Sequence, residues 1–241
     1  MRSAGLRAVF FDVGNTLLYA EPSVSEVCRQ VLAEWGHVHD LHAIDSLMPL
    51  VDAYYEERYA EDDAFWADEE RTSSVWVGMY SLLCRKLGIE AEAVEIARRV
   101  YDEFGRSDRW AVYTDVRPAF ERLRAAGLYT GIISNWDSRL VALLHGLGLG
   151  DVLDVIVSSA DVGLHKPDPR IFELACARLR IAPEQAAHVG DHHYADILGA
   201  RAVGMQTVLM DRHGTACAEN EPVSTLDVLE EVLGLVPRRL V

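Results

Sequence analysis

Residues 8–16 read Ala-Val-Phe-Phe-Asp-Val-Gly-Asn-Thr, a short apolar run that ends in Asp12 and a turn. A continuous apolar run bounded by turn residues is typical of a strand buried in a parallel sheet. Similar runs recur later in the chain, at residues 129–133, 155–157, 188–189 and 207–210. Together these runs predict the strands of a parallel sheet that begins with residues 8–11.

Helical patterns lie between the later runs, at residues 117–126, 138–147, 169–180 and 195–203. Strands that alternate with helices indicate βαβ units, in which helices cover both faces of a parallel sheet. We therefore expect a doubly wound, Rossmann-like α/β fold, with a final amphipathic helix at residues 224–235.

Residues 19–113 break this alternation, because they show helical patterning and no strand candidates. Helices are expected at residues 23–35, 43–59, 73–87 and 91–104. The acidic segment 61–70 is expected to be a solvated loop between two of these helices. The pattern predicts that residues 1–18 and 114–241 form the α/β core, and that residues 19–113 form an all-helical insertion.

The composition is that of an ordinary globular protein, with 241 residues, 38 Asp and Glu, 23 Lys and Arg, and a formal charge of −15. Nucleic acids and anionic membranes both attract basic surfaces, so neither is an expected partner. The four cysteines have no paired spacing, which argues against a disulfide framework or a zinc site and favours a reducing compartment. Without a signal-peptide pattern or an apolar span, we expect a cytoplasmic protein, either a monomer or a homodimer.

Polar residues follow the predicted strands at their carboxyl ends, the edge at which parallel α/β sheets bind ligands. These residues are Asp12, Gly14, Thr16, Ser134, Asn135, Lys166, Asp191 and Asp196. Two acids alone would be a weak signal, but an ordered set of Asp, Ser, Lys and Gly-Asp-x4-Asp is a specific one. We therefore expect one site that combines these carboxylates with a hydroxyl and a lysine.

Four segments at these positions resemble the motifs of the haloacid dehalogenase superfamily, and the resemblance covers nearly the whole chain. The segments are residues 10–17, 133–135, 166–172 and 190–196. The helical insertion resembles the α-helical cap of that superfamily. A narrower likeness, to the group that includes haloacid dehalogenase-like hydrolase domain-containing protein 3 and rhythmically expressed gene 2, is carried by residues 133–140, 166–172 and 187–205.

The resemblance implies a hydrolase in which Asp12 is a nucleophile that forms an aspartyl-phosphate. It also implies Mg²⁺, which offsets the repulsion between this carboxylate and a phosphate group. The implied catalytic residues are Asp12, Ser134 and Lys166. The implied substrate-binding residues are Thr16, Ser134, Asn135 and Lys166, with Thr16 also ordering its loop. The implied metal-binding residues are Asp12, Gly14 through its carbonyl, Asp191 and Asp196.

One position departs from the family pattern. Phosphatases of the superfamily usually carry a second Asp two residues after the nucleophile, and here that residue is Gly14. The backbone carbonyl that binds Mg²⁺ is kept, whereas the side chain that protonates the leaving group and activates water is lost. General acid–base catalysis is typically worth about 10²–10⁴-fold, so activated esters should react much faster than alkyl phosphates.

Three functions remain open at this point. We favour a Mg²⁺-dependent phosphatase that acts on a small phosphorylated metabolite, in which acid–base catalysis is weak or is supplied by His192, His193 or a cap residue. A metal-independent 2-haloacid dehalogenase-type enzyme would also lack the second Asp, but here Asp191 and Asp196 are retained. The third function is a regulatory protein that binds phosphate or Mg²⁺ with little turnover.

Aromatic residues of the insertion are candidates for contact with the part of the substrate that does not react. The candidates are Trp66, Trp76 and Tyr80, although aromatic residues at helical spacing more often belong to a core. Arg71 lies beside the acidic segment and could meet an anionic substrate, with a surface ion pair as the alternative.

Overall fold

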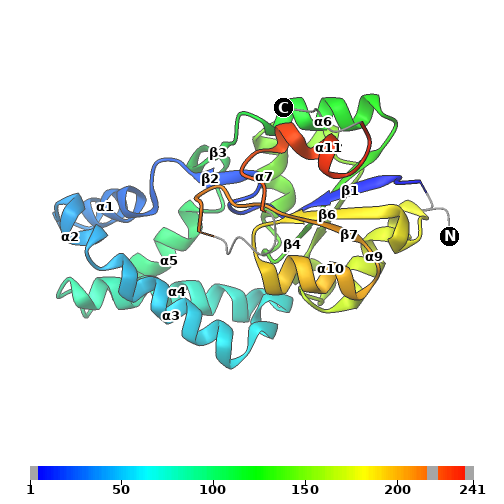
Figure 1. The fold of residues 1–241 in the computed structure, drawn as a ribbon. Helices are drawn as coiled ribbons and strands as arrows, with labels where there is room; N and C mark the ends of the chain where they lie inside the picture. Colours follow the sequence, from blue (N-terminus) through cyan, green and yellow to red (C-terminus); the bar gives the residue numbers. More distant parts are fainter. Residues whose placement is uncertain (1–4, 216–221, 237–241) are drawn as a thin grey trace.

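A five-stranded parallel sheet lies at the centre of the α/β core, with strand order β5-β4-β1-β6-β7 (Figure 1). The computed structural model describes residues 5–215 and 222–236. The strands are β1 (Ala8–Phe11), β4 (Tyr129–Ser134), β5 (Val155–Ser158), β6 (Ala186–Gly190) and β7 (Gln206–Leu209). Each strand lies where an apolar run predicts it, so the predicted parallel sheet is confirmed.

Both faces of the sheet are buried. Alternate side chains of β1 point to opposite sides of the sheet, and each set packs into an apolar cluster. Val9 and Phe11 belong to one apolar cluster, in which Phe11 packs against Phe120 with ring centroids 5.0 Å apart. Ala8 and Phe10 belong to a second cluster on the other face. This two-sided burial explains why the strand reads as a continuous apolar run, and it confirms the doubly wound α/β fold.

Helices connect the strands and cover the two faces of the sheet. They are α6 (Val116–Ala125), α7 (Leu140–Gly146), α8 (Ser159–Val162), α9 (Pro169–Leu179) and α10 (Gly199–Ala202), with short 3₁₀ helices η3 (Gly150–Val152) and η4 (Pro183–Gln185). Two expected helices are divided instead. The π-helix η5 (His193–Leu198) precedes α10, and the 3₁₀ helix η7 (Leu226–Val228) precedes the short helix α11 (Leu229–Val232). The hydrogen-bond pattern changes within each segment, which side-chain periodicity does not reveal.

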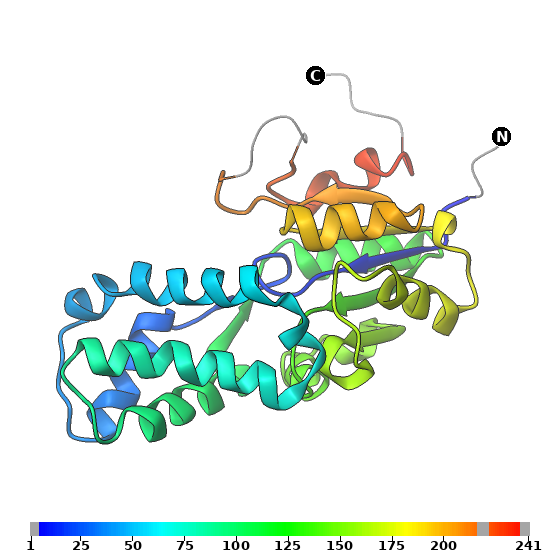
Figure 2. The same ribbon diagram turned by 90° about the horizontal axis from the view of Figure 1, so that it is seen from below.

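The helical insertion packs around an apolar cluster of its own and extends away from the sheet (Figure 2). Its helices are α1 (Val24–Glu34), α2 (Leu41–Asp45), α3 (Met48–Glu61), α4 (Glu69–Lys86) and α5 (Ala93–Glu103). The single helix expected at residues 43–59 is two helices, because Pro49 lies in the first turn of α3, where its fixed φ favours a new start. Helix α4 begins before residue 73, because the Asp68 side chain accepts a hydrogen bond from the Arg71 amide and caps the helix.

The acidic segment 61–70 is not simply a solvated loop. Residues Asp63–Ala67 form the 3₁₀ helix η1, in which Phe65 and Trp66 are only 3% and 8% exposed. The Thr72 hydroxyl donates a hydrogen bond to the Phe65 carbonyl at 2.8 Å and ties this turn to α4. The expectation was wrong because the many acidic residues of the segment mask two core side chains.

A short antiparallel ribbon joins the insertion to the core, where no strand was expected. Strands β2 (Leu18–Ala20) and β3 (Trp110–Val112) pair with each other, and the 3₁₀ helix η2 (Ser107–Arg109) precedes β3. Strands of three residues are too short to show an alternating pattern, so the sequence gives no signal for them. The division of the chain into residues 1–18, 19–113 and 114–241 stays a prediction.

Cys28, Cys84 and Cys176 are buried free thiols, whereas Cys217 lies outside the described residues. Within the described ranges, no helix combines the length and the apolar character that crossing a membrane would need.

Candidate active site

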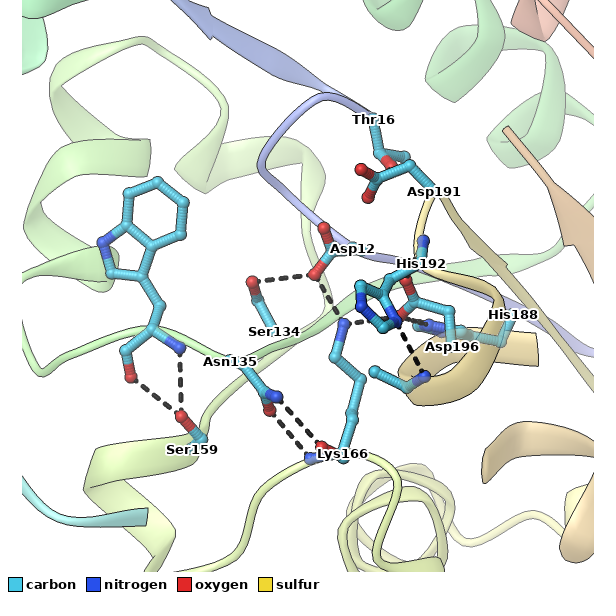
Figure 3. Close-up of polar contacts among 12 residues, drawn as sticks. Asp12, Thr16, Ser134, Asn135, Ser159, Lys166, His188, Asp191, His192 and Asp196 are labelled. Carbon is cyan, nitrogen blue, oxygen red and sulfur yellow. Dashed lines mark hydrogen bonds and ion pairs between the residues drawn. The ribbon is translucent and has the colours of Figure 1, made fainter. Parts of the chain in front are cut away.

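The predicted site residues meet at the carboxyl edge of the sheet (Figure 3). Asp12 directly follows β1, Ser134 ends β4, and Asp191 directly follows β6. Phe11, the last residue of β1, pairs with both Ile132 and Val189, so the central strand and its two neighbours end within two residues of one another. This register is what brings together side chains that lie far apart in the sequence.

Lys166 brings a buried positive charge to Asp12. Its side chain is 2% exposed, and its Nζ lies 2.5 Å from Oδ1 of Asp12 and 2.5 Å from Oδ1 of Asp196. Burial alone would lower the pKa of Lys166, but these two carboxylates raise it above its usual value, so the ammonium form is retained.

Asn135 and Ser134 hold the two partners of this ion pair. The Lys166 amide donates to Asn135 Oδ1 at 2.7 Å, and Asn135 Nδ2 donates to the Lys166 carbonyl at 3.0 Å. The Ser134 hydroxyl donates to Asp12 Oδ1 at 2.9 Å, the same oxygen that Lys166 contacts. Asn135 therefore orients Lys166, while its contact with a substrate stays a prediction.

Three carboxylates form a compact group at this edge. Oxygen atoms of Asp12, Asp191 and Asp196 lie within 4.8 Å of one another. Burial, followed by the charges of Asp12 and Asp196, raises the pKa of Asp191 to about 8. Burial would also raise the pKa of Asp196, but Lys166 holds it below its usual range. Crowded carboxylates of this kind suit a hard divalent cation, which relieves their repulsion.

Thr16 lies on the opposite side of Asp191 from the lysine, as Figure 3 shows. Its hydroxyl donates to Asp191 Oδ1 at 3.4 Å, and its carbonyl accepts a hydrogen bond from Arg212 Nη2 at 2.8 Å. Thr16 is fully buried. These contacts fix the loop after β1, and the predicted contact of Thr16 with a substrate remains untested.

Gly14 lies in the same loop and is partly buried. A Cβ atom placed on Gly14 would meet the Trp136 ring at 3.7 Å, which is ordinary van der Waals contact. The loop therefore has room for a Cβ atom at this position.

His188 was missed as a site residue because it was assigned only to a strand. It is fully buried in β6, and its Nε2 lies 2.8 Å from Asp196 Oδ1. Since the carboxylate can only accept, Nε2 carries the proton, and Nδ1 has no hydrogen-bond partner among the described residues. Burial lowers the pKa of His188, so the ring is neutral and orients Asp196. A histidine in an otherwise apolar strand was the available signal.

The two histidines after Asp191 differ in position. His192 Nδ1 accepts a hydrogen bond from the Ala195 amide at 3.1 Å and caps η5, and its ring lies 5.5 Å from that of Tyr59. His192 also lines the cavity described next, whereas His193 is exposed and is not among the described residues that line it. Of the pair, only His192 is placed to face a substrate.

A cavity of about 540 Å³ lies between the carboxyl edge of the sheet and the helical insertion. Asp12, Ser134 and Lys166 lie on its sheet side. The other lining residues include ten with aromatic rings of the Phe, Tyr or Trp type, namely Tyr19, Tyr55, Tyr59, Trp66, Trp76, Tyr80, Tyr101, Phe104, Trp110 and Trp136. The candidates Trp66, Trp76 and Tyr80 are thus all in the wall. Arg71 is not among the described lining residues and forms a surface ion pair with Asp62 at 2.5 Å.

A second ion pair lies in the wall of this cavity. Arg139 Nη2 is 2.6 Å from Asp137 Oδ2, and the guanidinium lies over the Tyr101 ring at 3.8 Å. The Tyr101 hydroxyl donates to Asp137 Oδ2 at 2.8 Å. The positive charge of Arg139 is therefore already matched by a carboxylate and an aromatic face.

Known proteins are similar to this chain in sequence and in fold. The sequence model of the haloacid dehalogenase-like hydrolase family matches residues 6–204. Haloacid dehalogenase-like hydrolase domain-containing protein 3 of Danio rerio is 30% identical over 210 residues, which cover 86% of each chain. This match confirms the narrower likeness that the motifs predict.

Two solved structures match at the same level. A HAD phosphatase from Thermococcus onnurineus has a TM-score of 0.65 and 26% identity, and covers 95% of this chain and 98% of its own. A 2-haloacid dehalogenase from Pseudomonas syringae pv. Tomato DC3000 has a TM-score of 0.65 and 25% identity, and covers 95% of this chain and 99% of its own. Similarity of fold thus does not separate the two chemistries. The chain belongs to the haloacid dehalogenase-like hydrolase family, and it is a hydrolase.

Proposed function

We propose that this hydrolase is a Mg²⁺-dependent phosphatase, which acts on a small phosphorylated molecule through an aspartyl-phosphate on Asp12. The observation that carries the proposal is the carboxylate group of Asp12, Asp191 and Asp196, whose oxygens lie within 4.8 Å of one another. Dehalogenase chemistry needs no metal and gives no reason for such a group. Residues 19–113 serve as a cap over the site, and the buried free thiols support a cytoplasmic location.

Asp12, Asp191 and Asp196 would hold the metal together with the Gly14 carbonyl. When bound, Mg²⁺ supplies positive charge that offsets the repulsion between the phosphate and Asp12. Asp191 depends on Thr16 for its orientation, and Asp196 depends on His188.

The proposed reaction has two steps. A carboxylate oxygen of Asp12 attacks phosphorus, a new O–P bond forms, and the ester O–P bond breaks with its electron pair on the leaving oxygen. Water then attacks the phosphorus of the aspartyl-phosphate, which releases inorganic phosphate and restores the carboxylate. Lys166 and Ser134 hold Asp12 and stabilise negative charge on the phosphoryl oxygens.

A regulatory protein with little turnover is the second candidate, because Gly14 cannot protonate a leaving group. The two functions differ in rate on substrates that need no such proton. The Asp12→Asn variant also separates them. It should abolish turnover by a phosphatase that uses Asp12, whereas a regulatory protein could still bind phosphate.

The test measures phosphate release from p-nitrophenyl phosphate by wild type, Asp12→Asn and a control, Asp45→Asn, whose carboxylate is exposed on α2. We expect Mg²⁺-dependent release by wild type and the control, and at least a hundredfold loss in Asp12→Asn. Release that is equal in Asp12→Asn would point to a contaminating enzyme and contradict the proposal. Halide release from a 2-haloacid in EDTA would assign the dehalogenase chemistry instead.

A further inference from the structure

The wall of the cavity indicates what kind of molecule the site accepts. We infer that the substrate is an aryl phosphate, a monoester whose aromatic ring is joined directly to the ester oxygen and carries no further anionic group. This inference rests on the proposed phosphatase function and adds the class of leaving group. Three features support it, namely the aromatic wall, the charges that line the cavity and the missing acid at Gly14.

Aromatic side chains along the cavity wall form a continuous array of ring contacts, from Tyr55 and Trp76 through Tyr80 and Phe104 to Trp136, which offers surfaces for a further ring. On the side of the insertion, the ring of Trp76 lies 5.6 Å from Tyr55 and 6.0 Å from Trp66. Trp110 of the β2–β3 ribbon and Trp136, which follows β4, lie 5.1 Å apart. These spacings are those of aromatic pairs, and a ring of the substrate would extend the array by stacked or edge contacts. A cavity of about 540 Å³ has room for such a group beside the phosphate.

The charges that line the cavity disfavour a second anionic group on the substrate. The lining residues include five carboxylates, on Asp12, Glu56, Asp137, Asp191 and Asp196. The fixed positive charges among the described lining residues are those of Lys166 and Arg139, and both are already paired with carboxylates. With Mg²⁺ on Asp12, Asp191 and Asp196, the metal and Lys166 serve the transferred phosphate. A carboxylate or second phosphate elsewhere on the substrate would then meet Glu56 and Asp137, and Arg139 is already paired with Asp137.

The leaving group of an aryl phosphate also matches the chemistry at Gly14. A phenol has a pKa of about 10, whereas an aliphatic alcohol is nearly as weak an acid as water, whose pKa is about 15.7. A phenolate can leave with the electron pair of the broken O–P bond and take a proton from water later. An alkoxide needs the proton during bond breaking, and Gly14 has no side chain to give it.

Four substrates separate the two requirements, the ring and the leaving group. Phenyl phosphate has both, benzyl phosphate has only the ring, acetyl phosphate has only the good leaving group, and ethyl phosphate has neither. We expect the two esters that carry a ring to show about three- to tenfold lower KM than their small counterparts. We expect kcat for phenyl and acetyl phosphate to exceed that of benzyl and ethyl phosphate by at least about a hundredfold. Equal KM values for phenyl and acetyl phosphate would overturn the inference. Equal KM values for phenyl phosphate and 4-carboxyphenyl phosphate would also overturn it.

A binding measurement keeps this inference distinct from the proposed function. Phenylphosphonate and methylphosphonate cannot be hydrolysed, and calorimetry with Mg²⁺ gives their Kd values without any turnover. Tighter binding of phenylphosphonate, by about threefold or more, supports the aromatic class even if no ester is hydrolysed and the phosphatase proposal fails. Equal Kd values would overturn the aromatic class while leaving Asp12-dependent turnover untouched.

Trp76→Leu tests the wall directly, with Trp35→Leu as the matched control. Trp35 is 39% exposed at the end of α1 and is not among the described lining residues. We expect Trp76→Leu to raise KM for phenyl phosphate about three- to tenfold and to change KM for acetyl phosphate less than twofold. The control should change neither value. If Trp76→Leu raises KM for phenyl phosphate and for acetyl phosphate by the same factor, the wall does not bind the ring and the inference is wrong. If the variant does not fold, the phosphonate comparison on wild type decides.

Discussion

The variant Gly14→Asp restores the acid that the family's phosphatases usually carry, at a position where a Cβ atom meets no clash. The added Cβ lies 3.7 Å from the Trp136 ring, and the backbone of Gly14 is outside the left-handed region, so the substitution adds no backbone strain. General acid–base catalysis is worth about 10²–10⁴-fold, or about 3–5 kcal/mol of barrier at about 1.36 kcal/mol per tenfold. We expect kcat for benzyl and ethyl phosphate to rise within this range, and kcat for phenyl phosphate to change less than tenfold.

The matched control is Gly14→Asn, which has nearly the same shape and cannot donate a carboxylic proton. Initial rates of phosphate release at saturating Mg²⁺ compare the two variants with wild type, and thermal melts verify that all three are folded. If Gly14→Asp is no faster than Gly14→Asn on alkyl esters while both are folded, the argument that Gly14 limits catalysis is refuted.

The carboxylates of Asp191 and Glu103 give opposite dependences of stability on pH. The folded-state pKa of Asp191, about 8, is above its unfolded value of 3.8, so metal-free wild type should lose stability as pH rises between these values. In urea unfolding with EDTA, Asp191→Asn should make the free energy of unfolding fall less steeply with pH. At pH 8 the variant should also lose the rise in Tm that Mg²⁺ gives wild type. The side chain of Glu103 is fully buried; burial alone would raise its pKa, but Arg109 and Arg99 hold it below 4.5. Glu103→Gln should lower the free energy of unfolding by about 1.5–3 kcal/mol above pH 5, and the difference should vanish as pH falls through the lowered pKa. A pH-independent difference would contradict the assignment to ionised Glu103.

The sequence predicts the sheet and the members of the site well for one physical reason. Strands buried on both faces are continuous apolar runs, and the first polar residue after each run marks the end of the strand. Asp12 and Asp191 are such residues, so their meeting follows from parallel strands that end within two residues of one another. Lys166 was also sought after a strand, but it lies eight residues beyond β5, so its place in the site depends on the path of the intervening chain.

What the sequence cannot supply is the set of contacts between side chains that are distant in the chain. Nothing in the sequence indicates that Asn135 would form hydrogen bonds with the backbone of Lys166, or that His188 would form one with Asp196. The aromatic side chains of the insertion show the spacing of an ordinary helix core. That Trp76 and Trp136, from different parts of the fold, line one cavity is a property of the tertiary arrangement.

The β2–β3 ribbon has a consequence for how this fold can diversify. Because Leu18 pairs with Val112 and Ala20 pairs with Trp110, both ends of residues 21–109 leave the core side by side. The whole segment therefore begins and ends at neighbouring positions, as a hairpin turn does. The entropic cost of closing such a loop grows only slowly with the number of residues in it. Helices can be added, exchanged or removed there without displacing a strand. Asp12 and its partner Lys166 can thus persist while a lineage acquires new substrates.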